Sequence, residues 1–295
     1  MKRPFELDPG EYPFTDHWLP YRDGHIHYLD EGQGPTVLLL HGNPTWSYLY
    51  RNVIKELCRE FRLIAPDYPG FGMSKAPEGY RFTPQEQSEA VHELIRHLDL
   101  KDFILVVQDW GGPIGLNYAV QHRDNLRGIV VMNTWAWPAK ILPMKLFSLA
   151  MGGPIGYWLQ TRLNFFAKTI VPNGIHHTEK VTDSLRKAYT DPFPTPKSRI
   201  PTWVFPGQIR KARAWLAAIE SKLSNLSDLP AQILWGTKDS AGFPLEQMAK
   251  WQKHLPMNET IVLEDASHYL QEDRPDQVAS AIRKILNRTQ GGVLL

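Results

Sequence analysis

One acidic residue occupies a position where a nucleophile is expected. Residues 103–106 are apolar, residues 107–113 are Val-Gln-Asp-Trp-Gly-Gly-Pro, and residues 114–119 have a helix-like composition. A strand, a sharp glycine turn and a helix in this order present a nucleophile at the top of a parallel sheet, and that residue is commonly serine. Here it is Asp109. The pattern departs from the common one at Val107, since glycine usually stands two residues before the nucleophile.

An aspartate nucleophile selects a particular chemistry. A serine oxygen that attacks a saturated carbon leaves an ether, which water does not remove under mild conditions. A carboxylate leaves an ester, and water activated by a general base can hydrolyse that ester at the enzyme's own carbonyl carbon. Asp109 therefore predicts displacement at an sp³ carbon, with a halide or an epoxide oxygen leaving. An ordinary acidic helix cap is the alternative, but it does not account for the flanking pattern.

Two further residues complete the predicted catalytic set. In this sheet architecture the chain order is nucleophile, acid, histidine. His268 lies in the loop after the last predicted strand, and we assign it as the general base. Asp239 ends a predicted strand and its glycine turn, and we assign it as the acid that orients His268, although a turn role alone stays open. The rival location after the preceding strand, residues 132–134, contains no acid.

Two neutral donors are placed to receive negative charge. Residues 41–44 are His-Gly-Asn-Pro and directly follow the predicted strand 37–40, where this architecture has one oxyanion donor. The backbone N–H groups of Asn43 and Trp110 are expected to form the oxyanion hole. The side-chain amide of Asn43 and the indole N–H of Trp110 are also expected to bind a halide ion. Neutral donors suit this role, because a positively charged side chain would release the halide slowly. Taken alone, Asn43 would be interpreted as a turn former and Trp110 as a core residue, but the two together beside Asp109 favour the binding role.

The sequence indicates no metal and no organic cofactor. His176 and His177 are adjacent, but neighbours in a loop point in different directions and no third ligand is evident. The remaining histidines apart from His268 are scattered and are most simply surface or packing residues.

The bulk properties exclude several classes of protein. A chain of 295 residues can bury one sizeable core with an inserted subdomain. Lysine and arginine number 33 against 31 acidic residues, a net charge of +2 without a long run of one sign, so neither nucleic acid nor an acidic membrane surface is indicated. Cys58 is the only cysteine and the first residues lack an apolar signal segment, so we expect a cytoplasmic protein.

Short apolar runs alternate with helical patterns, which is typical of an α/β sheet with helices on both faces. Helices are predicted at 84–98 and 274–286. The predicted strands are residues 26–29, 36–40, 62–65, 103–109, 128–132, 232–235 and 260–263.

The alternation stops between residues 134 and 228. This stretch has no convincing strand, and helical patterns occur at 144–151, 181–189 and 209–223. It is far longer than a crossover between two strands requires. We therefore predict a helical cap domain over the strand ends, with residues 1–133 and 229–295 forming the core domain. A separate partner-binding module is the alternative, but no linker-like composition marks either boundary.

With these residues in view, the chain resembles the haloalkane dehalogenases of the α/β-hydrolase superfamily. The resemblance rests on residues 41–49, 108–112 and 267–268 and extends from about residue 12 to 286. It implies a mostly parallel eight-stranded sheet, hydrolysis of a haloalkane by water to an alcohol and a halide ion, and no cofactor. It also implies the nucleophile, base, acid and two-residue halide site assigned above.

The pairing of Asn43 with Asp239 is similar to the third subfamily of these enzymes. Some members of that subfamily form large oligomers, so a homo-oligomer stays open. Trp135 and Trp137 are candidates for the pocket wall, although cap aromatic residues more often serve packing.

Three alternatives remain. Epoxide hydrolases resemble each other in having two cap tyrosines as proton donors, and Tyr157 and Tyr189 keep that option open, whereas Asn43 argues against it. A fluoroacetate-type dehalogenase is expected to have an arginine beside the nucleophile, where Trp110 stands. A non-catalytic binder on the same scaffold would not require the complete set of reactive residues.

Overall fold

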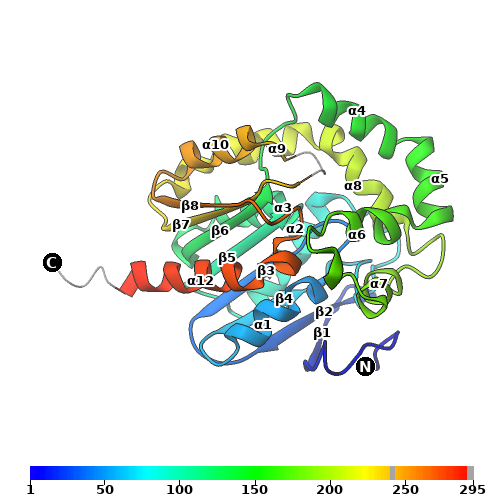
Figure 1. The fold of residues 1–295 in the computed structure, drawn as a ribbon, viewed down its shortest axis with the longest axis horizontal. Coiled ribbons are helices and arrows are strands. Elements are labelled where there is room, and N and C mark those ends of the chain that lie inside the picture. Colours follow the sequence, from blue (N-terminus) through cyan, green and yellow to red (C-terminus); the bar gives the residue numbers. More distant parts are fainter. Residues whose placement is uncertain (240–242, 291–295) are drawn as a thin grey trace.

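The computed structural model describes residues 1–239 and 243–290, and a central sheet of eight strands organises them (Figure 1). The strand order is β1-β2-β4-β3-β5-β6-β7-β8, and every pair is parallel except β1 with β2 and β2 with β4. This confirms the predicted α/β fold. The strands are β1 (Asp16–Tyr21), β2 (Gly24–Glu31), β3 (Thr36–Leu40), β4 (Arg62–Pro66), β5 (Phe103–Asp109), β6 (Leu126–Thr134), β7 (Ala231–Gly236) and β8 (Asn258–Leu263).

Helices cover both faces of this sheet. Alternate residues of β3 and β5 belong to two separate apolar clusters, one shared with α2, α3 and α10 and the other with α1 and α12. Strands buried on both faces have continuous apolar runs, which is why the sequence located them well. The helices are α1 (Arg51–Leu57), α2 (Pro84–His97), α3 (Gly111–Ala119), α10 (Leu245–His254), α11 (Leu270–Asp273) and α12 (Pro275–Gln290).

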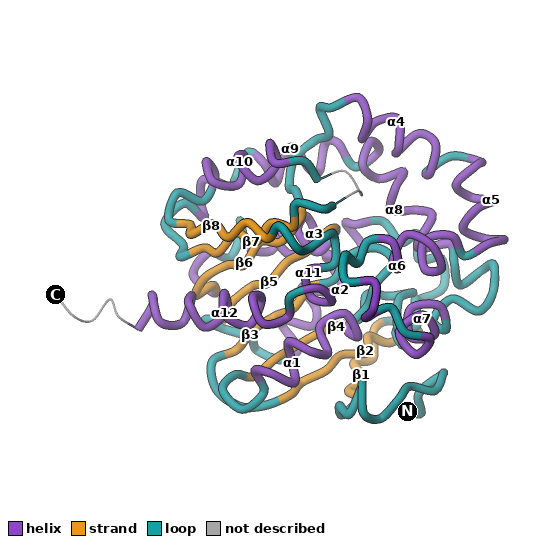
Figure 2. Tube along the Cα trace, viewed as in Figure 1, coloured by secondary structure: helices purple, strands orange, loops and turns teal. Residues whose placement is uncertain are grey.

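Only helices and loops lie between β6 and β7, as the colours of Figure 2 show. Figure 1 shows α4 and α5 as the outermost helices, on the upper right, with α8 beneath them. None of the described helices combines the length and the hydropathy needed to cross a bilayer. The helices of this segment are α4 (Leu142–Met151), α5 (Pro154–Leu163), α6 (Val171–Asn173), α7 (Asp183–Thr190), α8 (Ile200–Lys211) and α9 (Arg213–Glu220).

The prediction of a single helix over 209–223 was wrong. Two helices share this region, and they meet at Ala212, whose ψ of 17° leaves the helical range. The first of them begins at Ile200 and contains Pro206 in its interior. A proline inside a helix is unfavourable, so the sequence pattern obscured this helix. Helix α5 was missed for a related reason, since the glycines around Pro154 resemble a loop.

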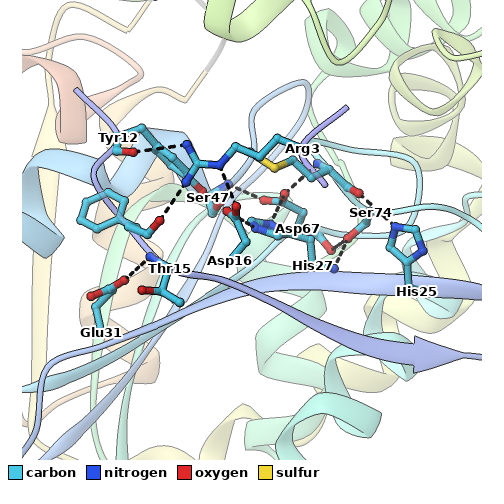
Figure 3. Close-up of polar contacts among 12 residues, drawn as sticks. Arg3, Tyr12, Thr15, Asp16, His25, His27, Glu31, Ser47, Asp67 and Ser74 are labelled. Atoms are coloured by element: carbon cyan, nitrogen blue, oxygen red, sulfur yellow. Dashed lines mark hydrogen bonds and ion pairs between the residues drawn. The ribbon is translucent and has the colours of Figure 1, made fainter. Parts of the chain in front are cut away.

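A buried polar network ties the start of the chain to the sheet edge (Figure 3). His27 on β2 bridges two carboxylates, with Nδ1 2.8 Å from Asp67 Oδ2 and Nε2 3.1 Å from Asp16 Oδ1. Arg3 donates to the other oxygen of Asp16 at 2.6 Å, and the backbone N–H of Ser47 donates to Asp67 Oδ1 at 2.8 Å. Because Ser47 follows the loop after β3, the network also anchors the end of that loop.

Candidate active site

The turn between β5 and α3 places Asp109 in a backbone conformation that few residues adopt. Asp109 has φ of 50°, in the left-handed region. A Cβ at Gly111 would collide with the backbone carbonyl of Leu40, and a Cβ at Gly42 would collide with the Asp109 side chain. The glycines therefore allow β3, the turn and the nucleophile to approach one another closely.

The bulk of Val107 is accommodated by a glycine one turn into α3. An ideal Cβ at Gly115 would lie 3.1 Å from Val107 Cγ1 and 2.7 Å from Leu40 Cδ1. Because Gly115 has no side chain, there is room for the Val107 side chain, and glycine is not needed at position 107. This compensation explains the departure noted in the sequence.

The predicted base and acid meet Asp109 at the carboxyl ends of the strands. His268 Nε2 lies 3.7 Å from Asp109 Oδ2, and His268 Nδ1 lies 2.9 Å from Asp239 Oδ2. Asp109 and His268 are both buried. The structure therefore brings all three residues together from positions that are up to 159 residues apart, in the order the prediction requires.

Asn133 supports the predicted acid, and nothing in its local sequence indicates this contact. Its Nδ2 donates to Asp239 Oδ2 at 2.7 Å and to the carbonyl of Gly236 at 3.1 Å, and its Oδ1 accepts from the N–H of Gly236 at 2.9 Å. Asn133 stands at the rival location where no acid was found. In place of an acid, this position has an amide that bonds Asp239, which follows the neighbouring strand β7.

Gln108 holds the base from the other side. Its Nε2 donates to the carbonyl oxygen of His268 at 3.1 Å, which fixes the orientation of the amide. The same nitrogen lies 3.0 Å from His268 Nε2. An amide N–H facing Nε2 favours the neutral imidazole that carries its proton on Nδ1, toward Asp239. This is the tautomer that a general base requires.

The two predicted donors flank Asp109. The backbone N–H of Asn43 donates to Asp109 Oδ1 at 2.8 Å, and the backbone N–H of Trp110 also bonds the Asp109 carboxylate. The side-chain Nδ2 of Asn43 donates to the carbonyl of Thr202 on α8 at 3.3 Å, which leaves its second hydrogen for a ligand. Trp110 lines the cavity described below, and no described residue accepts from its indole N–H.

The pKa values of Asp109 and His268 are both raised. Burial raises the pKa of Asp109, against the lowering effect of His268 and the two backbone N–H groups. Burial on its own would lower the pKa of His268, but Asp239 and then Asp109 outweigh it, and the net pKa is raised. Part of the basicity of His268 therefore depends on the charge of Asp109.

A cavity of about 500 Å³ lies over these residues and is mostly apolar. Of the two tryptophans proposed for the pocket wall, Trp135 lines the cavity and Trp137 does not. The Nε1 of Trp137 instead donates to Gln247 Oε1 at 2.6 Å. The wall consists of Asn43, Asp109, Trp110, Trp135, Ile141, Pro143, Met144, Phe147, Phe166, Ile170, Pro206, Ile209, Asp239, Phe243, Pro244, His268 and Tyr269.

Neither cap tyrosine considered as a proton donor belongs to this wall. Tyr157 is partly exposed, and the hydroxyl of buried Tyr189 donates to Glu272. Within residues 1–239 and 243–290, no group of three or more His, Cys, Asp or Glu side chains could hold a metal ion. His176 and His177 instead donate their backbone N–H groups to Asp273.

Comparisons with known proteins identify the fold and the family. Residues 35–275 match the family model described as the alpha/beta hydrolase fold. The chain is 39% identical to haloalkane dehalogenase 2 of Mycobacterium tuberculosis over 96% of this chain and 98% of that protein. It is 34% identical to a cis-3-alkyl-4-alkyloxetan-2-one decarboxylase of Xanthomonas campestris, over 95% and 98%. The crystal structure of haloalkane dehalogenase DbeA from Bradyrhizobium elkani superposes with a TM-score of 0.84 at 27% identity, over 93% and 99%.

Proposed function

The chain belongs to the haloalkane dehalogenases of the α/β-hydrolase superfamily, which are hydrolases acting on carbon–halogen bonds, and we propose that Asp109 carries the reaction as a covalent nucleophile. The observation that supports this most directly is the chain of contacts at the cavity floor, from Asp109 through His268 to Asp239. We further propose that residues 134–228 are the cap domain, that residues 1–133 and 229–295 are the core domain, and that the enzyme is cytoplasmic.

In the first step a carboxylate oxygen of Asp109 attacks the halogen-bearing carbon. The carbon–halogen bond breaks with its electron pair on the halide, and an alkyl ester remains on Asp109. The departing ion is held by the indole N–H of Trp110 and the free amide hydrogen of Asn43. Both donors are neutral, so the ion is bound without a formal charge partner and can leave after turnover.

In the second step His268 takes a proton from water at Nε2, and the water oxygen attacks the ester carbonyl carbon. The backbone N–H groups of Asn43 and Trp110 stabilise the oxyanion that forms. The carbon–oxygen bond to the alkyl group's oxygen then breaks, and that oxygen takes the proton from His268 to give the alcohol. Asp109 returns to its ionised form by releasing a proton to solvent.

Esterification itself prepares the base for this second step. The negative charge of Asp109 contributes to the raised pKa of His268. An ester carries no charge, so that contribution disappears once the intermediate forms. His268 is therefore more readily neutral in the intermediate than in the free enzyme, at the moment when it has to accept a proton.

Epoxide hydrolysis is not favoured. An alkoxide leaving group needs a proton donor, and neither Tyr157 nor Tyr189 reaches the cavity. A second candidate rests on the relative named as an oxetanone decarboxylase. A strained lactone also offers a carbon to an attacking carboxylate, and its alkyl chains would suit the apolar wall. We rank it second because Asn43 and Trp110 provide neutral donors suited to a halide.

The test is a substrate panel on one enzyme preparation. We expect halide release from iodobutane and other terminal haloalkanes, without diol formation from styrene oxide. Asp109→Ala, with an unchanged circular dichroism spectrum, should release no halide. Alkene formation from a dialkyl oxetanone without any halide release would reverse the order of the two candidates.

A further inference from the structure

Helix α4 is packed against its neighbour through small residues at its C-terminal end. Its sequence is almost wholly apolar, yet Ser148 is its only buried residue. The hydroxyl of Ser148 donates to the carbonyl of Pro206 on α8 at 2.7 Å. The residue after the helix, Gly152, lies so close to Gly207 that a Cβ there would collide with the Gly207 backbone. The seam between α4 and α8 is therefore narrow, and the large side chains point elsewhere.

Those large side chains lie on the outside of the molecule. Of the thirteen large apolar residues that are exposed in the described chain, nine fall between residues 141 and 163. A helix on a protein surface normally turns its apolar stripe inward, and α4 does the opposite. Exposed apolar groups gathered in one place mark an interaction surface. We call this group the cap face: Ile141, Leu142, Leu146, Phe147, Leu149, Ile155, Tyr157, Trp158 and Leu163.

The charged residues in the segment that forms the cap face are all positive. The sequence has no aspartate or glutamate from residue 125 to 178, whereas Lys140, Lys145 and Arg162 are exposed between the apolar residues. Over residues 134–228 there are thirteen lysines and arginines against five acidic residues. The rest of the chain has twenty against twenty-six, so the net charge conceals this asymmetry. The expectation that no acidic membrane surface is involved rested on that net charge, and the local charge revises it.

The cap face is continuous with the cavity wall. Ile141 and Phe147 are partly exposed to solvent and also line the cavity above Asp109. Pro143 and Met144, on the same first turns of α4, line it as well. An apolar molecule on the cap face is thus separated from the catalytic residues only by the thickness of this helix and its side chains.

We propose that the cap face binds the surface of an anionic lipid bilayer, from which apolar substrate enters the cavity. Basic residues beside exposed leucine, tryptophan and tyrosine side chains are the combination that lies in a bilayer interface and is attracted by anionic headgroups. A second copy of the chain fits less well, because pairing two cap faces would bring Lys145 and Arg162 close to their own copies without an intervening acid. Figure 1 shows α4 and α5 projecting on the outer side, where a flat surface can reach them.

Vesicle flotation with the full chain tests the proposal. We expect the protein to float with vesicles of phosphatidylglycerol and phosphatidylcholine in equal parts. Binding to pure phosphatidylcholine should be weaker, on the order of a hundredfold for about three lysine or arginine side chains near the surface. High salt should reduce the difference. Failure to float with either vesicle, or equal flotation with both, would overturn the proposal.

A pair of variants separates the cap face from general surface apolarity. Leu146→Glu with Trp158→Glu should abolish flotation, whereas Leu245→Glu with Met257→Glu, equally exposed but outside the cap face, should not. All four side chains are at least half exposed, so both variants should fold, and circular dichroism checks this. Flotation of the first variant at the wild-type level contradicts the proposal. The proposal is also contradicted if sedimentation velocity finds the wild type to be a dimer and finds that only the Leu146→Glu, Trp158→Glu variant is a monomer.

The proposal is independent of the catalytic assignments. Asp109→Ala should float like the wild type although it releases no halide. Conversely, the cap-face variant should keep its activity on a short, water-soluble haloalkane, since neither Leu146 nor Trp158 lines the cavity.

Discussion

At the scale of single residues, Asp109 and His268 are expected to act in different half-reactions. In the proposed scheme the carboxylate alone performs the displacement, and the imidazole is needed only to remove the ester. In His268→Phe the first half-reaction should therefore proceed and the second should stall. Intact-mass measurement after incubation with a haloalkane should find the protein heavier by one alkyl group. An unmodified mass after long incubation would count against the ester, and Asp109→Ala serves as the control that acquires no group.

Asp239 and Asn133 should behave as one unit. Asp239→Asn is expected to lower kcat by about 10⁴-fold, as loss of the orienting acid does in serine triads. Asn133→Ala removes the amide that bonds Asp239 and should cost roughly 10- to 100-fold, as is typical of a supporting hydrogen bond. In the Asp239→Asn background the same Asn133 change should cost little more. Independent, multiplying losses would place Asn133 outside the unit.

The pH dependence of the two half-reactions should differ. His268 must be neutral to accept a proton, so ester hydrolysis should slow as the pH falls through the pKa that His268 has in the intermediate. In the free enzyme the charge of Asp109 contributes to a raised pKa of His268. Because the ester no longer carries the Asp109 charge, the pKa governing this step should lie below the pKa of His268 in the free enzyme. Single-turnover rates against pH, compared with an NMR titration of His268 in the resting enzyme, measure both values. Identical values would contradict the coupling.

The three residues that meet at the cavity floor could be predicted from the sequence, but the residues that contact them from neighbouring elements could not. Asp109, His268 and Asp239 each follow a recognisable strand, so pattern and chain order locate them. Asn133 and Gln108 act across 106 and 160 residues of sequence, on a neighbouring strand and a loop. Nothing in their local sequence indicates those contacts, because they arise only from the order of the strands in the sheet.

At the scale of elements, the network around His27 joins β1, β2 and the loop after β4. Burial would lower the pKa of His27, but Asp67 and Asp16 raise it to about 9. Since the folded pKa exceeds the ordinary value of 6.5, the stabilisation is complete below about 6.5 and is lost as the pH rises toward 9. A shift of this size corresponds to about 3 kcal/mol.

Urea unfolding measures this contribution. His27→Gln should reduce the free energy of unfolding by a few kcal/mol near pH 6 and by much less near pH 9. His25, a neighbour on β2 without two carboxylate partners, provides the matched control as His25→Gln. A loss that does not vary with pH would mean that His27 contributes through packing and not through its charge.

Strands with unbroken apolar runs were the easiest elements to predict from the sequence. Strands β3 and β5 have unbroken apolar runs and were located to within a residue or two. Strand β1 lies at the sheet edge, contains Pro20 and was missed. The position of helix α8 was predicted wrongly because Pro206 and Gly207, which are poor helix formers, lie where it crosses α4. At this crossing the two residues allow close contact between the helices.

At the scale of the whole molecule, the packing of the helices above the sheet is expected to control substrate binding separately from chemistry. Helix α4 contributes Met144 and Phe147 to the cavity wall and contacts α8 through the Gly152–Gly207 approach. Gly152→Val would force the two helices apart and displace that wall, while the contacts among Asp109, His268 and Asp239 lie on the sheet side. KM for a haloalkane should rise by roughly 10-fold or more, and kcat should change little, because the interaction that is lost stabilises the bound substrate and the transition state equally.

Ala150→Val makes a comparable change on the exposed side of α4 and should leave both constants near the wild type. A fall in kcat with unchanged KM in Gly152→Val would show that α4 positions the reacting groups themselves, and the separation of binding from chemistry would then be wrong.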